Sequence, residues 1–254
     1  MINQLNLPDS VRSVLGNRAL TMENAGCSGA FVAYAGDDLV LKRDAAGSLN
    51  GACKMQGFLS SFGLSPESVY YESGEVDYLI SRRVPGESAI SNGHLSDPKR
   101  LAHALGGIAR KLHEIPLKGC PVRGLADGWK QNVEALINGN SFDPDYVGFL
   151  GIRSREEAAS LFRKYASLFR NECVIHGDLC LPNYMLSDFS FRALIDVGAA
   201  GVGDRHYDLF WTLWSMWFNL KTDAWSDAFL SAYGKQDVNW DLIRAAGAMC
   251  ALGG

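Results

Sequence analysis

The alternation of apolar and polar residues predicts a small antiparallel sheet in the first third of the chain. Apolar residues dominate positions 31–34 and 39–42, and a polar turn with one glycine separates the two runs. Short apolar runs joined by such a turn are typical of a β-hairpin. Two further runs within residues 66–86 predict another pair of strands. The segment between the two pairs, residues 47–63, is expected to be a helix.

Beyond residue 97 the period of the apolar positions changes to that of helices. Apolar residues recur at intervals of three and four, which places them on one side of a helix. The expected helices cover residues 98–113, 127–137, 155–169, 209–220, 226–234 and 239–250. Strands followed by a mainly helical part predict the α+β fold class.

Residues 174–208 carry the densest pattern of polar residues with chemical potential. His176, Asp178 and Asn183 lie in a short loop, and two short apolar runs follow, the second of which ends at Asp196. Phosphoryl transfer needs a carboxylate that orients a hydroxyl and accepts its proton, together with oxygen ligands for Mg²⁺. Asp178 fits the first role. Asn183 and Asp196 fit the second, because adjacent short strands would bring them to the same edge.

This segment resembles the aminoglycoside 3'-phosphotransferases, which have a protein-kinase-like fold. Their pattern is His-Gly-Asp, four residues, Asn, then Ile-Asp-x-Gly, then Asp-Arg-x-x-Asp-Leu. The matching residues are His176, Gly177, Asp178, Asn183, Ile195, Asp196, Gly198, Asp204, Arg205, Asp208 and Leu209. The resemblance implies two lobes, an N-terminal nucleotide-binding lobe (residues 1–86) and a C-terminal catalytic and substrate-binding lobe (residues 87–254). It also implies ATP- and Mg²⁺-dependent transfer to a hydroxyl, most directly the 3'-hydroxyl of an aminoglycoside.

The resemblance assigns further residues to the nucleotide. Lys42 would hold the α- and β-phosphates, the backbone at Ser28 would lie near the terminal phosphates, and Val40 would adjoin the adenine. Backbone groups of the link at residues 81–84, represented by Arg82 and Val84, would form hydrogen bonds with the adenine. His176 and Asp208 would support the catalytic loop.

The chain departs from the kinase-like pattern at one important point. In such folds a glutamate on the next helix pairs with the phosphate-holding lysine, but residues 47–63 contain no acidic residue. Gly51 or Ala52 stands where the glutamate is expected, and Asp44 is a conceivable substitute. Without that partner Lys42 would position phosphates less firmly. A catalytically weak or non-catalytic nucleotide-binding protein is therefore an alternative function.

The acceptor side also differs from the family. Residues 141–152 correspond to its acidic substrate loop, in which Asp143 and Asp145 remain. Asp223 and Arg205 are further candidate substrate contacts, and Arg205 together with its neighbour would also shape the loop beyond the metal. The acidic and aromatic tail typical of the family is not found at the end of this sequence. A kinase for another antibiotic or a metabolite is a second alternative. A protein kinase is not favoured, because no activation segment separates residues 196 and 204.

Composition narrows the setting and the partners. The chain has 254 residues, 47% hydrophobic and 20% charged, with a formal net charge of -4. This charge gives no reason to expect a nucleic-acid partner and is compatible with a polycationic aminoglycoside. The six cysteines form no CxxC pair, which favours reduced thiols and a cytoplasmic protein. We expect neither a signal peptide nor a membrane span, and the sequence does not predict an oligomeric state.

Three kinds of residue could be given either a chemical or a structural role. Cys180 lies within the catalytic loop, but a packing role is favoured over a nucleophilic one. His113 ends an expected helix and is interpreted as structural. The tryptophans at positions 211, 214 and 217 could stack on a ligand, but apolar residues on nearly every side of their helix favour a buried core helix.

Overall fold

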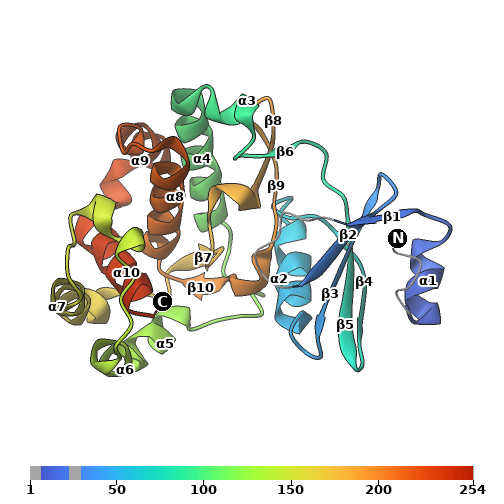
Figure 1. Ribbon diagram of the computed structural model, residues 1–254, viewed down its shortest axis with the longest axis horizontal. Helices are drawn as coiled ribbons and strands as arrows, with labels where there is room; N and C mark the ends of the chain where they lie inside the picture. The colour runs from blue at the N-terminus through green and yellow to red at the C-terminus, as the bar shows by residue number, and fades with distance from the viewer. Residues whose placement is uncertain (1–6, 23–29, 254) are drawn as a thin grey trace.

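The protein is built from a small sheet-containing lobe and a larger, mostly helical lobe (Figure 1). The computed structural model describes residues 7–22 and 30–253. The two lobes lie side by side, with helix α2 of the small lobe facing the strands of the large one. This arrangement confirms the α+β fold class. Ser28, predicted to lie near the terminal phosphates, falls outside the described residues.

The small lobe contains one antiparallel sheet with the strand order β1-β2-β3-β5-β4. The strands are β1 (Leu20–Met22), β2 (Phe31–Ala35), β3 (Leu39–Ala45), β4 (Ser68–Ser73) and β5 (Val76–Arg82). Leu39 and Leu41 of β3 pack in a small core with Val11 of helix α1 (Asp9–Leu15). Side chains alternate between the faces of a strand, so Val40 and Lys42 lie on the opposite face, toward the large lobe.

A buried carboxylate fixes the start of helix α2 (Asn50–Ser60) on that second face. Asp77 of β5 accepts hydrogen bonds from the N–H groups of Gly47 and Leu49, at 2.8 and 2.9 Å, and from two hydroxyl groups. The hydroxyls belong to Tyr71 and Ser73. Burial raises the pKa of Asp77, but these four hydrogen bonds outweigh it and hold the pKa below its ordinary 3.8. Asp77 therefore anchors the helix that faces the catalytic segment.

We expect the substitution Asp77→Asn to lower the free energy of unfolding by about 1–3 kcal/mol near neutral pH. An amide oxygen cannot serve all four donors, and its NH₂ group opposes them. The pKa of Asp77 is depressed in the folded state, so its contribution is present above the unfolded pKa and is lost as the pH falls through the folded value. Urea unfolding should thus show parent and variant converging below about pH 4. Asp44→Asn, on the adjacent strand, is the matched control, and an equal loss in that variant would contradict the assignment.

The large lobe is formed mainly by helices around a single large core. They are α3 (Asn92–Leu95), α4 (Pro98–His113), α5 (Leu125–Gln131), α6 (Val133–Asn138), α7 (Arg155–Tyr165), α8 (Arg205–Leu220), α9 (Ser226–Tyr233) and α10 (Trp240–Gly253). Helix α4 shows why they form. Asp97 caps its first turn by accepting a hydrogen bond from the N–H of Arg100, Pro98 occupies the first turn, and Leu101, Leu105 and Leu112 face the core.

Two small sheets carry the catalytic segment between these helices. Strand β7 (Cys173–Ile175) pairs with β10 (Gly201–Gly203), and β6 (Glu87–Ser88), β8 (Tyr184–Ser187) and β9 (Ser190–Leu194) form a three-stranded sheet. The short 3₁₀ turns η4 (Leu181–Asn183) and η5 (Val197–Ala199) follow β7 and β9 along the chain. The turn after β9 packs against α2, and hydrogen bonds between Ile195 and the residues His176 and Asn183 join it to the loop after β7.

The structure refines one expectation about the elements and leaves another untested. The helix predicted for residues 127–137 is interrupted, because Asn132 has non-helical backbone angles between α5 and α6. Strand β5 ends at Arg82 and β6 begins at Glu87 within the other lobe, and the lobe boundary at residue 86 remains our prediction. Among the described residues, no helix has the length and apolar character needed to cross a membrane.

Candidate active site

The loop after β7 is held by a single buried carboxylate, that of Asp208 on α8. Its two oxygens accept hydrogen bonds from the backbone N–H groups of His176, at 2.7 Å, and Gly177, at 2.9 Å. Gly177 has a φ of +80°, and a Cβ there would lie 2.2 Å from the carbonyl oxygen of Ala199. Only glycine meets both conditions. The glycine and the two hydrogen bonds therefore fix the backbone directly before Asp178.

Asp178 and Asn183 are joined by the side-chain amide of Asn183. The Nδ2 atom of Asn183 donates to the backbone oxygen of Asp178 at 2.8 Å and to its carboxylate at 3.0 Å. The amide nitrogen orients the carboxylate, while the amide oxygen keeps its acceptor capacity. An amide oxygen and a carboxylate are hard ligands of the kind that Mg²⁺ binds.

Asp196 reaches this place through strand pairing. The N–H of Ile195 donates to the carbonyl oxygen of Asn183 at 3.0 Å, which extends the β8–β9 ladder and sets Asp196 beside Asn183. Asp196 has a φ of +59°, a left-handed conformation that costs about 1–2 kcal/mol for a residue other than glycine. Its side chain is 44% exposed and forms an ion pair with Lys42 at 2.6 Å. The structure thus brings together Lys42, Asp178, Asn183 and Asp196, as predicted.

His176 connects the two halves of the site. Its Nδ1 atom accepts from the N–H of Asp178 at 3.3 Å, so the ring proton lies on Nε2, which donates to the carbonyl oxygen of Ile195 at 2.9 Å. The imidazole therefore ties the loop of Asp178 to the end of β9 and acts as a structural support, as expected.

The structure shows which partner Lys42 has in the absence of a glutamate on α2. Ala52 is buried, and its Cβ lies 3.7 Å from the position that a Cβ on Gly198 would occupy. Helix α2 therefore presents a methyl group to the turn after Asp196. Asp44 does not replace the glutamate, because its carboxylate accepts from the N–H of Ala45 at 2.7 Å. Lys42 instead pairs directly with Asp196.

The other residues assigned to the nucleotide lie around the end of β3 and β5. Val40 is half-buried on the same face as Lys42. The N–H of Arg82 already donates to the carbonyl oxygen of Glu67 at 2.9 Å, and its exposed side chain lies near Glu67 and Asp38. Adenine would therefore need backbone groups other than this N–H, such as those of half-buried Val84.

The candidate acceptor residues are dispersed. Asp143 accepts from the N–H of Asp145 at 2.9 Å, and this short turn precedes η1 (Pro144–Tyr146). Asp223 is exposed in the α8–α9 connection, where it lines a cavity of about 330 Å³ together with Phe149 and Asp227. Arg205 is different, because its Nε donates to Glu172 at 2.5 Å and its guanidinium lies near the hydroxyl of Tyr233. The guanidinium is thus engaged by protein groups, and a substrate contact of Arg205 stays a prediction.

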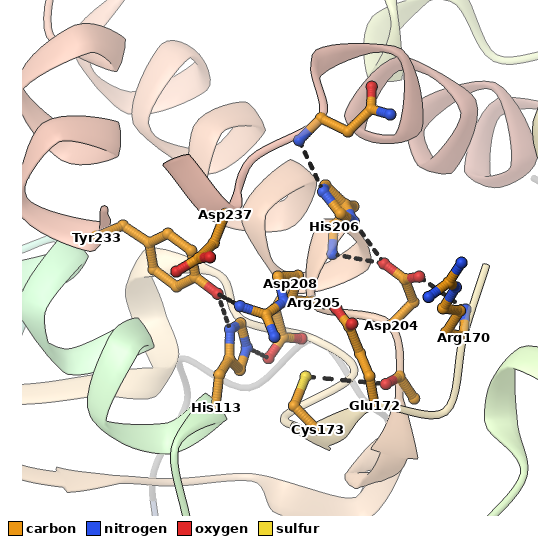
Figure 2. Close-up of polar contacts among 12 residues, drawn as sticks. His113, Arg170, Glu172, Cys173, Asp204, Arg205, His206, Asp208, Tyr233 and Asp237 are labelled. Carbon is orange, nitrogen blue, oxygen red and sulfur yellow. Dashed lines mark hydrogen bonds and ion pairs between the residues drawn. The ribbon is translucent and has the colours of Figure 1, made fainter. Parts of the chain in front are cut away.

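Behind the catalytic loop, a buried polar network reaches helices α4 and α9 (Figure 2). His113 contacts Asp208 through Nε2 at 3.1 Å and the hydroxyl of Tyr233 through Nδ1 at 2.8 Å. His113 is therefore structural, as interpreted, but its contact with the residue that holds the catalytic loop was not foreseen. No local pattern could reveal it, because the partners are 95 and 120 positions away.

A neighbouring group has the composition of a metal site but is fully engaged. Glu172, Asp204 and His206 offer ligand atoms within 4.8 Å of one another. Glu172 pairs with Arg205, Asp204 contacts the ring of His206 at 2.6 Å, and the other ring nitrogen accepts from the N–H of Asn239 at 2.9 Å. Figure 2 shows these contacts closing around the start of α8. They act as support for α8.

Cys180 behaves as a packing residue. Burial raises the pKa of its thiol far above the ordinary value, with the Asp178 charge acting in the same direction. The thiol is therefore protonated at neutral pH and a poor nucleophile. Among the described cysteines, residues 53, 120, 173, 180 and 250 are all free thiols, as expected.

The tryptophan helix packs into the core, as interpreted, but its tryptophans lie at the edge of that core. The side of α8 that enters the core carries Leu209, Leu213 and Met216, whereas the tryptophans at 211, 214 and 217 are only half-buried. When a helix is apolar on nearly every side, the periodicity of its sequence does not show which side faces the core.

In this site the amide of Asn183 holds the carboxylate of Asp178, and the exposed carboxylate of Asp196 lies next to them. Lys42 reaches Asp196 from the separate sheet lobe. This arrangement defines a protein-kinase-like phosphotransferase. Residues 29–246 match the family described as "Phosphotransferase enzyme family". The chain is 34% identical to a probable aminoglycoside 3'-phosphotransferase of Lactococcus lactis, over 83% of this chain and 81% of that protein. It is 33% identical to the streptomycin 3''-kinase of Streptomyces griseus, over 73% of each chain.

The solved structures agree with the sequence relatives. The fold superimposes on the crystal structure of an aminoglycoside 3'-phosphotransferase of type VIII with a TM-score of 0.71 and 26% identity, covering 96% of both chains. The chain therefore belongs to the phosphotransferase enzyme family and is an enzyme that transfers phosphate to hydroxyl groups.

Proposed function

We propose that this protein transfers the terminal phosphoryl group of ATP to a hydroxyl of an aminoglycoside in the cytoplasm, where ATP is available. The observation that carries the proposal is the Asn183 amide that clasps the carboxylate of Asp178. It leaves the carboxylate oriented as a base and the amide oxygen as a ligand, which is the division of labour that phosphoryl transfer requires.

Each residue then has a defined task. Asp178 orients the acceptor hydroxyl and accepts its proton as the oxygen attacks phosphorus. Asn183 and Asp196 fit Mg²⁺ by their oxygen donors, and the bound ion would neutralise charge on the phosphates. Lys42 lies 2.6 Å from Asp196 and would exchange this partner for phosphate oxygens when the nucleotide binds. His176 and Asp208 keep the loop in place.

An aminoglycoside is the acceptor that best fits the surroundings. Curated relatives of this chain carry aminoglycoside 3'-phosphotransferase or streptomycin 3''-kinase activity in their names. Exposed Asp145, half-buried Asp143 and exposed Asp223 offer negative charge to a cationic substrate. We infer the 3'-hydroxyl as the acceptor position from the Lactococcus lactis relative, whose similarity extends over 83% of this chain.

The test is a transfer assay with the purified chain, ATP, Mg²⁺ and kanamycin. We expect ATP consumption that depends on kanamycin and a phosphorylated product whose position is assigned by phosphorus and proton NMR. Streptomycin, assayed in parallel, distinguishes the 3' from the 3'' acceptor position. Absence of transfer to both, with Mg-ATP binding retained, would contradict the proposal.

The direct Lys42–Asp196 contact favours a second candidate, a nucleotide-binding protein with weak or no transferase activity. The ion pair occupies a lysine and a metal ligand at once, and the described part of α2 offers no carboxylate to hold the lysine elsewhere. A nucleotide must break this pair before its phosphates reach Lys42. Binding of Mg-ATP without transfer to any hydroxyl compound would support this candidate.

Lys42→Met measures what the lysine contributes. We expect the KM for ATP to rise about tenfold or more, because a charge-assisted contact to phosphate is worth roughly 1.5–3 kcal/mol. Arg43→Met, one residue further along β3, is the matched control and should change the KM by less than about twofold. Steady-state kinetics with varied ATP give both values, and equal effects of the two substitutions would remove Lys42 from the nucleotide site.

A further inference from the structure

Helix α8 has one face that holds the catalytic loop. The hydroxyl of Thr212 donates to the carbonyl oxygen of Leu179 at 2.8 Å, and the hydroxyl of Ser215 accepts from the N–H of Leu181 at 3.0 Å. These contacts fix the residues that follow Asp178. The tryptophans adjacent to Thr212 and Ser215 in the sequence therefore lie at the flank of the catalytic loop.

The neighbouring face of α8 carries a continuous set of aromatic rings. We call Tyr146, Trp211, Trp214 and Phe218 the aromatic surface. Tyr146 lies 5.3 Å from Trp214 between ring centroids, and Trp214 stacks on Phe218 at 5.4 Å with 22° between the planes. Phe218 is 48% exposed, so the surface opens to solvent at this end. The indole N–H of Trp214 donates to the carbonyl oxygen of Asp145 at 3.0 Å, which fixes the ring to the candidate acceptor loop.

The inner end of the aromatic surface lies beside the catalytic loop. The ring of Tyr146 contacts that of Trp211 at 5.5 Å between centroids, and the next residue of α8, Thr212, donates to the carbonyl oxygen of Leu179 directly after Asp178. The aromatic surface therefore extends from the flank of the loop that carries Asp178 to the candidate acceptor loop, where Trp214 donates to Asp145.

We propose that the aromatic surface determines acceptor specificity by receiving the apolar face of an amino-sugar ring, with Trp214 as its main contact, because the ammonium group of Lys221 already lies over the Phe218 ring at 4.3 Å. Sugar rings present C–H groups on one face, and ammonium groups are attracted to aromatic rings. Of the candidate acceptor carboxylates, Asp143 already accepts from the N–H of Asp145. We therefore assign stacking a larger share of acceptor binding than charge pairing. This inference rests on the proposed function.

Kinetics of Trp214→Ala test the proposal, with kanamycin as the acceptor. The KM for kanamycin should rise about fivefold to thirtyfold, while kcat and the KM for ATP stay within about twofold. Trp214→Phe keeps an aromatic face and should restore most of the affinity. Leu168→Ala, which removes another exposed apolar side chain far along the sequence from the site, is the control and should match the parent. Thermal melting of each variant verifies the fold.

Salt and fluorescence separate this proposal from the proposed function. Raising the salt concentration from 0.05 to about 0.5 M should weaken kanamycin binding less than threefold, because stacking is screened far less than exposed ion pairs. Tryptophan fluorescence should change on kanamycin addition without ATP, and Trp214→Phe should remove that change. If the parent transfers phosphate but Trp214→Ala keeps its KM, the inference is wrong and the function stands. If the parent neither transfers phosphate nor responds by fluorescence, both are wrong.

Discussion

Asp178→Asn should lower kcat by about 10²–10⁴-fold, the range expected when a positioned general base is removed. Asparagine preserves the size of the side chain and can still contact the acceptor hydroxyl, but it cannot accept the proton. The affinity for Mg-ATP should stay within about twofold, because the proposed nucleotide contacts lie at Lys42, Asn183 and Asp196. Initial rates at saturating substrates measure kcat, and calorimetry with a non-hydrolysable nucleotide measures affinity.

Asp188→Asn is the matched control for this substitution. Asp188 is 81% exposed, and its carboxylate is paired with Arg100 on the surface. The change alters the same functional group by the same chemistry, and kcat should equal that of the parent. Parent-like transfer by the Asp178→Asn variant would show that another group takes the proton, and the assignment of the base would have to be abandoned.

We expect the substitution Asp208→Ala to lower the free energy of unfolding and to abolish phosphoryl transfer. Asp208 is fully buried and accepts from the N–H groups of His176 and Gly177 and contacts the ring of His113. Alanine leaves these groups buried without a partner, which costs about 3–5 kcal/mol in the free energy of unfolding. The loop that carries Asp178 would lose its anchor, so activity should fall even where the variant is still folded.

Chemical unfolding and the transfer assay together distinguish the two effects of this substitution. Asp208→Asn retains one acceptor oxygen and should lie between the parent and the alanine variant in stability. Asp188→Ala again serves as the surface control, since an exposed ion pair contributes at most about 1 kcal/mol. An Asp208→Ala variant with the stability of the parent would mean that the loop is held by other contacts.

The sequence alone was sufficient for the catalytic segment because its geometry is local. A short loop carries His176, Asp178 and Asn183, and the hairpin of β8 and β9 brings Asp196 back to Asn183. Val40 and Lys42 were assigned to the nucleotide by resemblance, and the alternation of β3 places them on one face of the sheet. The relations among Asp178, Asn183 and Asp196 depend on backbone geometry over a few residues, so they could be predicted, and these residues lie together in the structure.

Tertiary packing decided the features that depend on distant partners. Lys42 and Asp196 are 154 positions apart, and their contact follows from Ala52 leaving the lysine no acid on α2. The half-buried position of the tryptophans on α8 was not predicted, because apolar residues surround that helix and its orientation is set by what packs against it. The position of Arg205 was likewise determined by Glu172 and Tyr233. A sequence specifies the chemistry that each residue can perform, whereas the packed lobes determine which partner it meets.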